Sequence, residues 1–232
     1  MENYPLITEK TKEQLVSRIC NHSFLTRCRS GNVNIGELKI FLVQQGLYSE
    51  YFTRYLCALM SNLPGRRHVR DLASNLCEEL GLTVESSVPH STMYREMLRH
   101  FDLTLEDAQP LLGTRRLIDV MFDNCRDPRA ARGLGALCLG GEALVSAMYA
   151  DIMAGFEACG IPRNVLEFFH VHVNCDDGHA ESMWNIMTEL TRSNANEAML
   201  MLSAGHALVD ARAEFFSSIE YAYAHRAELQ FA

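Results

Sequence analysis

Two histidines and an aspartate in the last third of the chain have a spacing that suits metal binding. His172, Asp176 and His179 occur in the stretch Phe-Phe-His-Val-His-Val-Asn-Cys-Asp-Asp-Gly-His. On an α-helix, which turns by about 100° per residue, their side chains fall within roughly 60° of one another. Two imidazoles and a carboxylate on one helix face are a ligand set with which helical bundles hold iron or manganese. His170 and Asp177 point away from this face by the same arithmetic.

A solvated polar stripe on a surface helix is the alternative interpretation of this triplet. The flanking residues argue against it, because they give the same helix a large apolar face: Val165, Leu166, Phe168, Phe169, Trp184, Ile186 and Met187. Ionisable groups buried in such surroundings need partners, since an unpaired buried charge is costly. We therefore expect further ligands on other helices.

Acidic residues in apolar segments are the natural partners. Glu142 lies in the least polar stretch of the chain, residues 134–150, where small neighbours would let another helix approach closely. A second region offers Glu78, Glu79, Glu85 and His90. The spacing alone does not choose between Glu78 and Glu79 as the inward carboxylate.

Together these candidates comprise two or three carboxylates and three histidines on three helical segments. That inventory is typical of a dinuclear iron or manganese carboxylate site. It contains too many oxygen ligands for structural zinc and too many histidines for calcium. The ferritin-like version requires two Glu-x-x-His motifs, which this chain does not contain. The sequence therefore predicts a different arrangement of such a site.

The elements that must position these residues are helices almost throughout. Apolar residues recur at three-and-four spacing, and no long segment alternates with period two. We expect seven or eight helices, at about residues 11–28, 34–62, 68–80, 89–101, 112–124, 127–159, 163–191 and 195–230. Thr11-x-x-Gln14 resembles a capping box, and Gly81 suits a helix C-terminus. The connections are short, which predicts one all-α bundle over residues 1–232.

Composition narrows the function classes. The 232 residues carry a formal net charge of −8, which argues against nucleic-acid binding and against attachment to anionic membranes. The eight cysteines form no C-x-x-C pair, and the N-terminus has no signal-peptide pattern, so we expect reduced thiols in a cytoplasmic protein. Residues 134–150 are short for a membrane span and contain Glu142, which predicts a buried helix.

The ligand candidates resemble the pattern of the heme-oxygenase-like diiron oxidases, whose wider superfamily includes thiaminase II and pyrroloquinoline-quinone synthase C. That pattern is a Glu, a His about ten residues later, an isolated Glu, and then His-x3-Asp-x2-His. Here the phrase Asn-Leu-x-x-Glu-x-Gly begins at Asn75. The resemblance covers roughly residues 10–215, and it implies this ligand set: Glu79, His90, Glu142, His172, Asp176 and His179. The long Glu79–His90 spacing leaves Glu78 or Glu85 as alternatives to Glu79.

The resemblance implies a heme-oxygenase-like bundle that binds two iron ions, cycling between Fe(II) and Fe(III), with O2 as cosubstrate. An external reductant is an option in such chemistry. The expected activity is an oxidoreductase reaction on a small molecule in natural-product biosynthesis, preferentially an amino acid or derivative, by fragmentation, N-oxygenation or nitrile formation. The alternatives are a fatty-acid decarboxylating diiron oxidase, a metal-free thiaminase II-like hydrolase, and a non-catalytic protein that binds metal or a partner.

Substrate-pocket candidates follow from helix arithmetic around the ligands. Ser146 and Tyr149 follow Glu142 on its helix, Tyr94 follows His90 by four residues, and Gln44 and Tyr48 share a face of the second helix. On the last helix, an inward His206 or Arg212 would meet a carboxylate. These scattered polar groups favour a small polar acid as substrate. We expect no catalytic side chain beyond the ligands, and a homodimer would be compatible with the fold.

Overall fold

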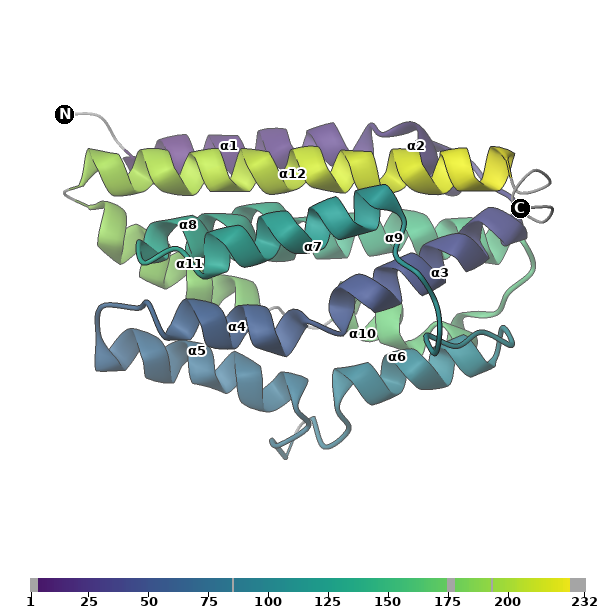
Figure 1. Cartoon of the computed structure of the whole chain (residues 1–232), viewed down its shortest axis with the longest axis horizontal. Coiled ribbons are helices and arrows are strands. Elements are labelled where there is room, and N and C mark those ends of the chain that lie inside the picture. The colour runs from purple at the N-terminus through teal and green to yellow at the C-terminus, as the bar shows by residue number, and fades with distance from the viewer. Residues whose placement is uncertain (1–3, 85, 175–177, 193, 226–232) are drawn as a thin grey trace.

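The chain forms helices connected by turns and loops, the longest described loop joining α6 to α7 (Figure 1). The computed structural model describes residues 4–84, 86–174, 178–192 and 194–225, and no strand occurs among them. The elements are α1 (Tyr4–Cys20), α2 (Ser23–Arg29), α3 (Ile35–Ser49), α4 (Phe52–Met60), α5 (Arg66–Glu79), α6 (His90–Arg99), α7 (Leu112–Cys125), α8 (Ala130–Leu134), the π-helix η1 (Gly135–Glu142), α9 (Ala143–Ala158), the 3-10 turn η2 (Arg163–Val165), α10 (Glu167–Asn174), α11 (Gly178–Thr191) and α12 (Ala195–Ala224). The all-α prediction is confirmed.

Several expected long helices are divided, so the predicted boundaries were wrong there. The helix expected over residues 11–28 is α1 followed by α2, because His22 starts a new helix: its Nδ1 accepts a hydrogen bond from the backbone N–H of Phe24. The segments 34–62 and 163–191 are likewise divided, the first into α3 and α4, the second into η2, α10 and α11. Thr11 is not a cap, since α1 already begins at Tyr4.

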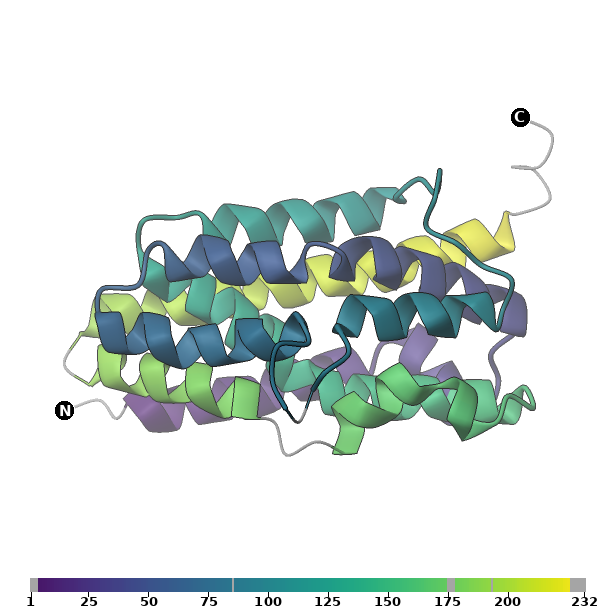
Figure 2. The same cartoon turned by 90° about the horizontal axis from the view of Figure 1, so that it is seen from below.

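The divided helices pack against α5 and α6. α4 and α11 contact α5, and α3 and α10 contact α6. Figure 2 shows α5 and α6 running end to end, with the turn between them near the middle of the molecule. Helix ends are therefore brought to mid-bundle, where side chains from several elements can converge.

The centre of the bundle is the continuous helical segment Ala130–Ala158, packed against the long α12. It is long and apolar enough to cross a membrane by length and composition, yet 72% of its most apolar window is buried inside the protein. Such burial is typical of a core helix in a globular protein, which agrees with the buried helix predicted for residues 134–150.

Glycines let η1 and α12 approach each other at backbone distance. A Cβ added to Gly135 would lie 2.1 Å from the carbonyl oxygen of Met201, and one added to Gly140 would lie 2.6 Å from Cβ of Leu208. From the other side, a Cβ on Gly205 would meet Leu139 at 2.9 Å. The close approach predicted from the small residues around Glu142 is therefore present, and α12 is the helix that makes it.

The π-helical winding of η1 was not predicted from the sequence. Hydrogen bonds from i to i+5 widen this segment by one residue per turn, and such insertions occur frequently at functional sites. Here the π-helix ends at Glu142, the acidic residue of the apolar stretch. Winding and packing together therefore fix the direction of that side chain.

The substitution Gly135→Ala should destabilise the protein, because the new methyl group collides with backbone atoms of α12 that cannot move aside. Overpacking of this kind costs about 1–3 kcal/mol or more. Gly141→Ala is the matched control in the same π-helix, since its Cβ would have no neighbour closer than 3.7 Å. Thermal unfolding followed by circular dichroism should show a lower Tm for the first variant alone. Equal Tm values would contradict the packing described.

Candidate metal centre

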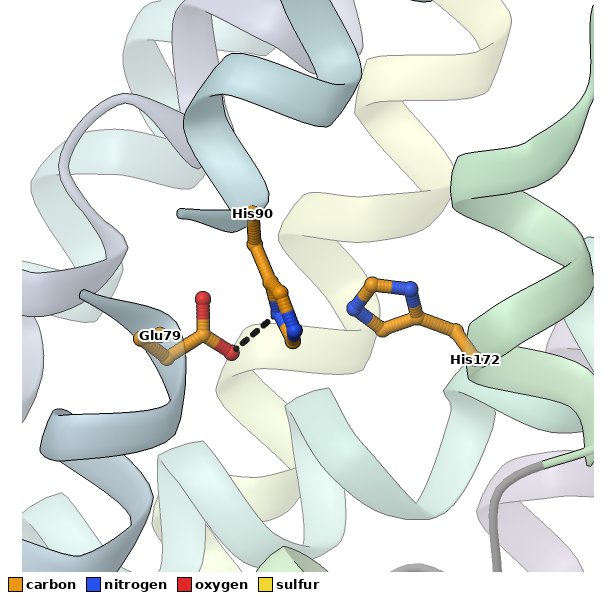
Figure 3. A group of neighbouring side chains, drawn as sticks. All are labelled: Glu79, His90 and His172. Carbon is orange, nitrogen blue, oxygen red and sulfur yellow. Dashed lines mark ion pairs between the residues drawn. The ribbon is translucent and has the colours of Figure 1, made fainter. Parts of the chain in front are cut away.

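Glu79, His90 and His172 come together at the middle of the bundle (Figure 3). Their potential ligand atoms all lie within 4.8 Å of one another. The three come from different elements: Glu79 ends α5, His90 begins α6, and His172 lies in the last turn of α10. Two imidazoles and one carboxylate therefore face a common point, as the sequence suggested for these three residues.

The turn after α5 brings Glu79 and His90 together. Gly81 has φ +68° and forms a Schellman turn, in which its N–H donates to the carbonyl of Glu78 and the N–H of Leu82 donates to that of Cys77. A Cβ at Gly81 would lie 2.6 Å from the nitrogen of Pro89, so the returning chain passes directly over the helix end. Gly81 thus acts as the predicted helix terminator and also sets the spacing of two site residues.

Glu79 and His90 form a largely buried ion pair. Oε1 of Glu79 lies 3.1 Å from Nδ1 of His90, and the side chains are 10% and 12% exposed. The alignment is not that of a hydrogen bond, so Nδ1 of His90 is a buried nitrogen without a hydrogen-bond partner. Burial lowers the pKa of His90, but the neighbouring Glu79 carboxylate, with a smaller contribution from Glu78, outweighs this and raises the pKa above its usual value.

His172 is oriented by the backbone of its own helix. Its Nδ1 lies 2.6 Å from the carbonyl oxygen of Phe168. A carbonyl can only accept a hydrogen bond, so Nδ1 is the protonated nitrogen and Nε2 is the nitrogen that carries the lone pair. Nε2 is the nitrogen that faces His90 in Figure 3. The ring centroids of the two histidines are 4.8 Å apart. This arrangement is suited to a ligand that binds through Nε2.

A cavity of about 150 Å³ connects this cluster to Glu142, which is 8% exposed at the end of η1. The volume exceeds the space that a single water requires, so the cavity has room for ions and part of a small molecule. Its lining also includes polar and aromatic groups from α3, α6, α9, α10 and α12: Gln45, Tyr48, Ser49, Tyr94, Tyr149, Phe168 and Arg212. Four of the predicted ligands thus line one cavity.

Two predicted ligands, Asp176 and His179, lie outside the residues whose side chains the structure describes, and so does Glu85. Of Glu78 and Glu79, the geometry favours Glu79, since Glu79 lines the cavity and contacts His90 whereas Glu78 is absent from the lining. The assignment of individual ligands to a metal stays a prediction.

Of the substrate-pocket candidates, Tyr48, Tyr94, Tyr149 and Arg212 line the cavity. Gln44 does not, because its amide accepts from Leu111 N and Thr114 Oγ1 and donates to the Gln109 carbonyl. Its neighbour Gln45, which was not predicted, takes the cavity position.

Ser146 and His206 are exposed, so their assignment to the pocket was wrong. Val145 and Tyr149 line the cavity, which centres the inward face of α9 near Val145 and turns Ser146 about 100° away. On α12 the inward residue is Arg212, 3% exposed, instead of His206.

The one Glu-x-x-His spacing in the chain, Glu167 to His170, does not contribute to the cavity. Both residues are exposed on α10. His170 is therefore turned outward, as the helix arithmetic predicted, while His172 two positions later is turned inward.

Comparison with known proteins agrees with this site. Residues 39–213 match the family described as "Iron-containing redox enzyme". The chain belongs to this family. Among curated proteins, it resembles 4-chloro-allylglycine synthase from Streptantibioticus cattleyicolor, at 27% identity over 164 residues. That match covers 67% of this chain and 62% of the relative, so the chain corresponds to less than two thirds of the relative's length.

Solved structures show the same fold as this iron-containing redox enzyme. A TenA homologue from Pseudomonas syringae has a TM-score of 0.79 at 15% identity, over 94% of this chain and 93% of the other. A heme oxygenase-like domain of unknown function from Shewanella denitrificans also has a TM-score of 0.79, at 16% identity, over 98% and 96%. A CADD-like protein of unknown function from Nostoc punctiforme follows at 0.73, with 16% identity over 95% and 97%. The heme-oxygenase-like fold is thereby confirmed.

The described residues fit the iron that the family implies. Nδ1 of His90 is buried without a hydrogen-bond partner, and the contact of His172 Nδ1 with the Phe168 carbonyl turns Nε2 of His172 toward the cluster (Figure 3). Glu79 adds carboxylate oxygens within the same 4.8 Å cluster. Two imidazoles and a carboxylate form a donor set that suits non-heme Fe(II). An iron-containing redox enzyme would hold its metal here.

In the metal-free protein, His90 should titrate above pH 6.5. A histidine with a raised folded-state pKa stabilises the fold below its unfolded pKa, and this stabilisation disappears as the pH rises through the folded-state pKa. Glu79→Gln removes the carboxylate and leaves burial, so the pKa of His90 should fall below its ordinary value. Histidine NMR titration, assigned with His90→Ala, measures both values. The Tm difference between wild type and Glu79→Gln should be larger near pH 6 than near pH 8. A His90 pKa unaffected by Glu79→Gln would contradict the ion pair.

Proposed function

We propose that this protein is a non-heme diiron oxidoreductase that uses O2 to oxidise an amino acid or an amino-acid derivative in natural-product biosynthesis. The observation that carries the proposal is the convergence of Glu79, His90 and His172 in a cavity also lined by the buried Glu142. Membership of the iron-containing redox family supports iron as the metal.

The number of carboxylates favours two iron ions. Glu79, His90 and His172 alone make a two-histidine, one-carboxylate set, which is enough for one Fe(II). Glu142 adds a second buried carboxylate, and the sequence predicts Asp176 and His179 as additional ligands. Carboxylates that can bridge two ions are typical of dinuclear iron sites in helical bundles.

The cavity wall supports a small polar substrate. Gln45, Arg212, Tyr48 and Tyr149 lie along it. Nε of Arg212 is buried without a hydrogen-bond partner, and the Tyr149 hydroxyl accepts from Gln45, which leaves its proton for a ligand. A polar substrate would pair with these donors and a long alkyl chain would not. The curated relative is named for an amino acid, allylglycine, and this agrees with an amino-acid substrate.

Each group of residues would have a distinct role in the reaction. Bound iron supplies the redox chemistry with O2. Glu79, Glu142, His90 and His172 hold it, and the Phe168 carbonyl fixes the tautomer of His172. Tyr149 keeps its hydroxyl proton at physiological pH, because burial is the main cause that raises its pKa.

Anaerobic reconstitution with Fe(II), followed by iron analysis, tests the metal site. Wild type should bind about two irons per chain, and His172→Ala and Glu142→Ala should each bind less because a ligand is lost. His170→Ala is the matched control, since this exposed histidine lies on the same helix and should leave the iron content unchanged. Equal iron binding by His172→Ala and wild type would refute the ligand assignment, and one iron per wild-type chain would indicate a mononuclear centre.

The reaction is tested by mixing the loaded protein with O2 in a stopped-flow spectrometer and an oxygen electrode. The twenty protein amino acids and a series of fatty acids are added in turn. We expect O2 consumption to accelerate with an amino acid and the acceleration to vanish in His172→Ala. Stimulation by fatty acids alone would favour a fatty-acid decarboxylating oxidase. Absence of substrate-dependent O2 consumption throughout the panels would count against the proposed enzyme class.

A further inference from the structure

A buried guanidinium faces the cavity from α12. Arg212 is 3% exposed and lines the same cavity as the metal-ligand candidates. Its Nη1 donates a hydrogen bond of 2.8 Å to Oε1 of Gln45, and Nε is buried with no hydrogen-bond partner. The guanidinium also lies 4.5 Å from the ring centroid of Tyr48 and 5.2 Å from that of Phe215. The protein therefore contacts this cation mainly through aromatic faces and one amide.

Within the described part of the chain, Arg212 forms no ion pair with a carboxylate. The arginines that do pair with a carboxylate in the described part of the chain lie nearer the surface. Examples are Arg27, Arg29 and Arg163, whose side chains are 35%, 48% and 69% exposed. A buried charge without a counter-ion is costly, and contacts with aromatic rings compensate only part of that cost. An anionic ligand would supply the missing partner.

Gln45 and Tyr149 extend this polar group along the cavity wall. The side-chain amide of Gln45 accepts from Arg212 through Oε1 and donates to the hydroxyl oxygen of Tyr149 through Nε2, at 3.2 Å. Both amide atoms are thereby used, which fixes the orientation of Gln45. Since the hydroxyl oxygen of Tyr149 accepts from Gln45, its proton is available for donation to a ligand. The group thus presents guanidinium N–H and phenol O–H donors.

We propose that Arg212 and Tyr149 form the binding site for the carboxylate of the substrate, with Gln45 as the residue that positions both. A planar guanidinium has the geometry to bind a carboxylate through two parallel hydrogen bonds. The inference rests on the proposed function in one respect: the reacting end of the substrate would face Glu79, His90 and His172. In this proposal the protein binds the substrate through its carboxylate, and the carboxylate itself does not react.

Binding measured by isothermal titration calorimetry without O2 tests the proposal. The ligands are the amino acids and fatty acids of the activity panels, and then the strongest-binding carboxylate beside its carboxamide. The proteins are wild type, Arg212→Gln, Arg212→Lys and Tyr149→Phe, each checked for Tm and iron content. His206→Gln is the matched control, because His206 lies on the same helix and is exposed.

Wild type should prefer the carboxylate to the carboxamide. Arg212→Gln should weaken carboxylate binding about 10- to 100-fold, which corresponds to loss of a charged hydrogen bond, and should leave carboxamide binding nearly unchanged. Arg212→Lys should retain part of the preference, and Tyr149→Phe should reduce it less than Arg212→Gln. Iron content should stay at the wild-type level. If Arg212→Gln does not fold, Arg212→Lys and Tyr149→Phe test the proposal through the same comparison of carboxylate and carboxamide binding.

Equal weakening of carboxylate and carboxamide binding would overturn the proposal, because it would indicate a purely structural Arg212. Failure of every carboxylate to bind wild type would overturn it too. Repeating the titrations without iron separates this inference from the proposed function. A preference dependent on Arg212 in a protein that binds no iron would support the carboxylate site and refute the diiron enzyme. O2 consumption stimulated by a substrate without a carboxylate would support the proposed enzyme and refute the carboxylate site.

Discussion

Ionisable groups buried at the centre of an apolar bundle are the constraint around which this structure is organised. Glu79, His90 and Glu142 lie where water is largely excluded, and a charge in such a place requires a partner or a metal. Glu79 raises the pKa of His90 against the opposing effect of burial, which shows how strongly the two groups interact. Their burial is costly in a protein without a ligand for them, and the metal proposed to bind here would offset that cost.

Interruptions of the helices bring these groups together. An uninterrupted helix presents its side chains along its flank, but here Glu79 is the last residue of α5 and His90 is the first of α6. The positive φ of Gly81 and the close passage of Pro89 make the turn between them compact. The π-helix η1 ends at Glu142 in the same region. Local irregularities in backbone winding therefore coincide with the candidate metal centre.

Two closely packed elements, η1 and α12, form part of the cavity wall. Close packing between η1 and α12 through Gly135, Gly140 and Gly205 couples the helix of Glu142 to the helix of Arg212. The cation proposed to bind the substrate carboxylate and the carboxylate proposed to bind metal are thus carried by two helices in close contact. Such a support restricts relative motion of the two groups, which is what a site needs to hold a small substrate in one orientation.

The sequence by itself determined the fold class and the main ligand candidates. Apolar periodicity predicted an all-α bundle, and the isolated Glu142 in an apolar stretch predicted an inward carboxylate, because few buried positions tolerate a charge. The orientation of His172, opposite to that of His170, also followed from helix arithmetic. These features depend on local spacing, which a sequence contains directly.

Tertiary structure alone decided which neighbouring residue faces the cavity. Gln45 instead of Gln44 and Val145 instead of Ser146 differ by one position, or about 100° of helix rotation. Spacing left Glu78 and Glu79 open, and the structure favours Glu79, the residue that the family resemblance implied. The inward direction of a helix is set by the helices packed against it, and helix breaks such as that at His22 change its phase. Arg212 is buried because α12 packs along the core, and no local pattern around it distinguishes it from an arginine in solvent.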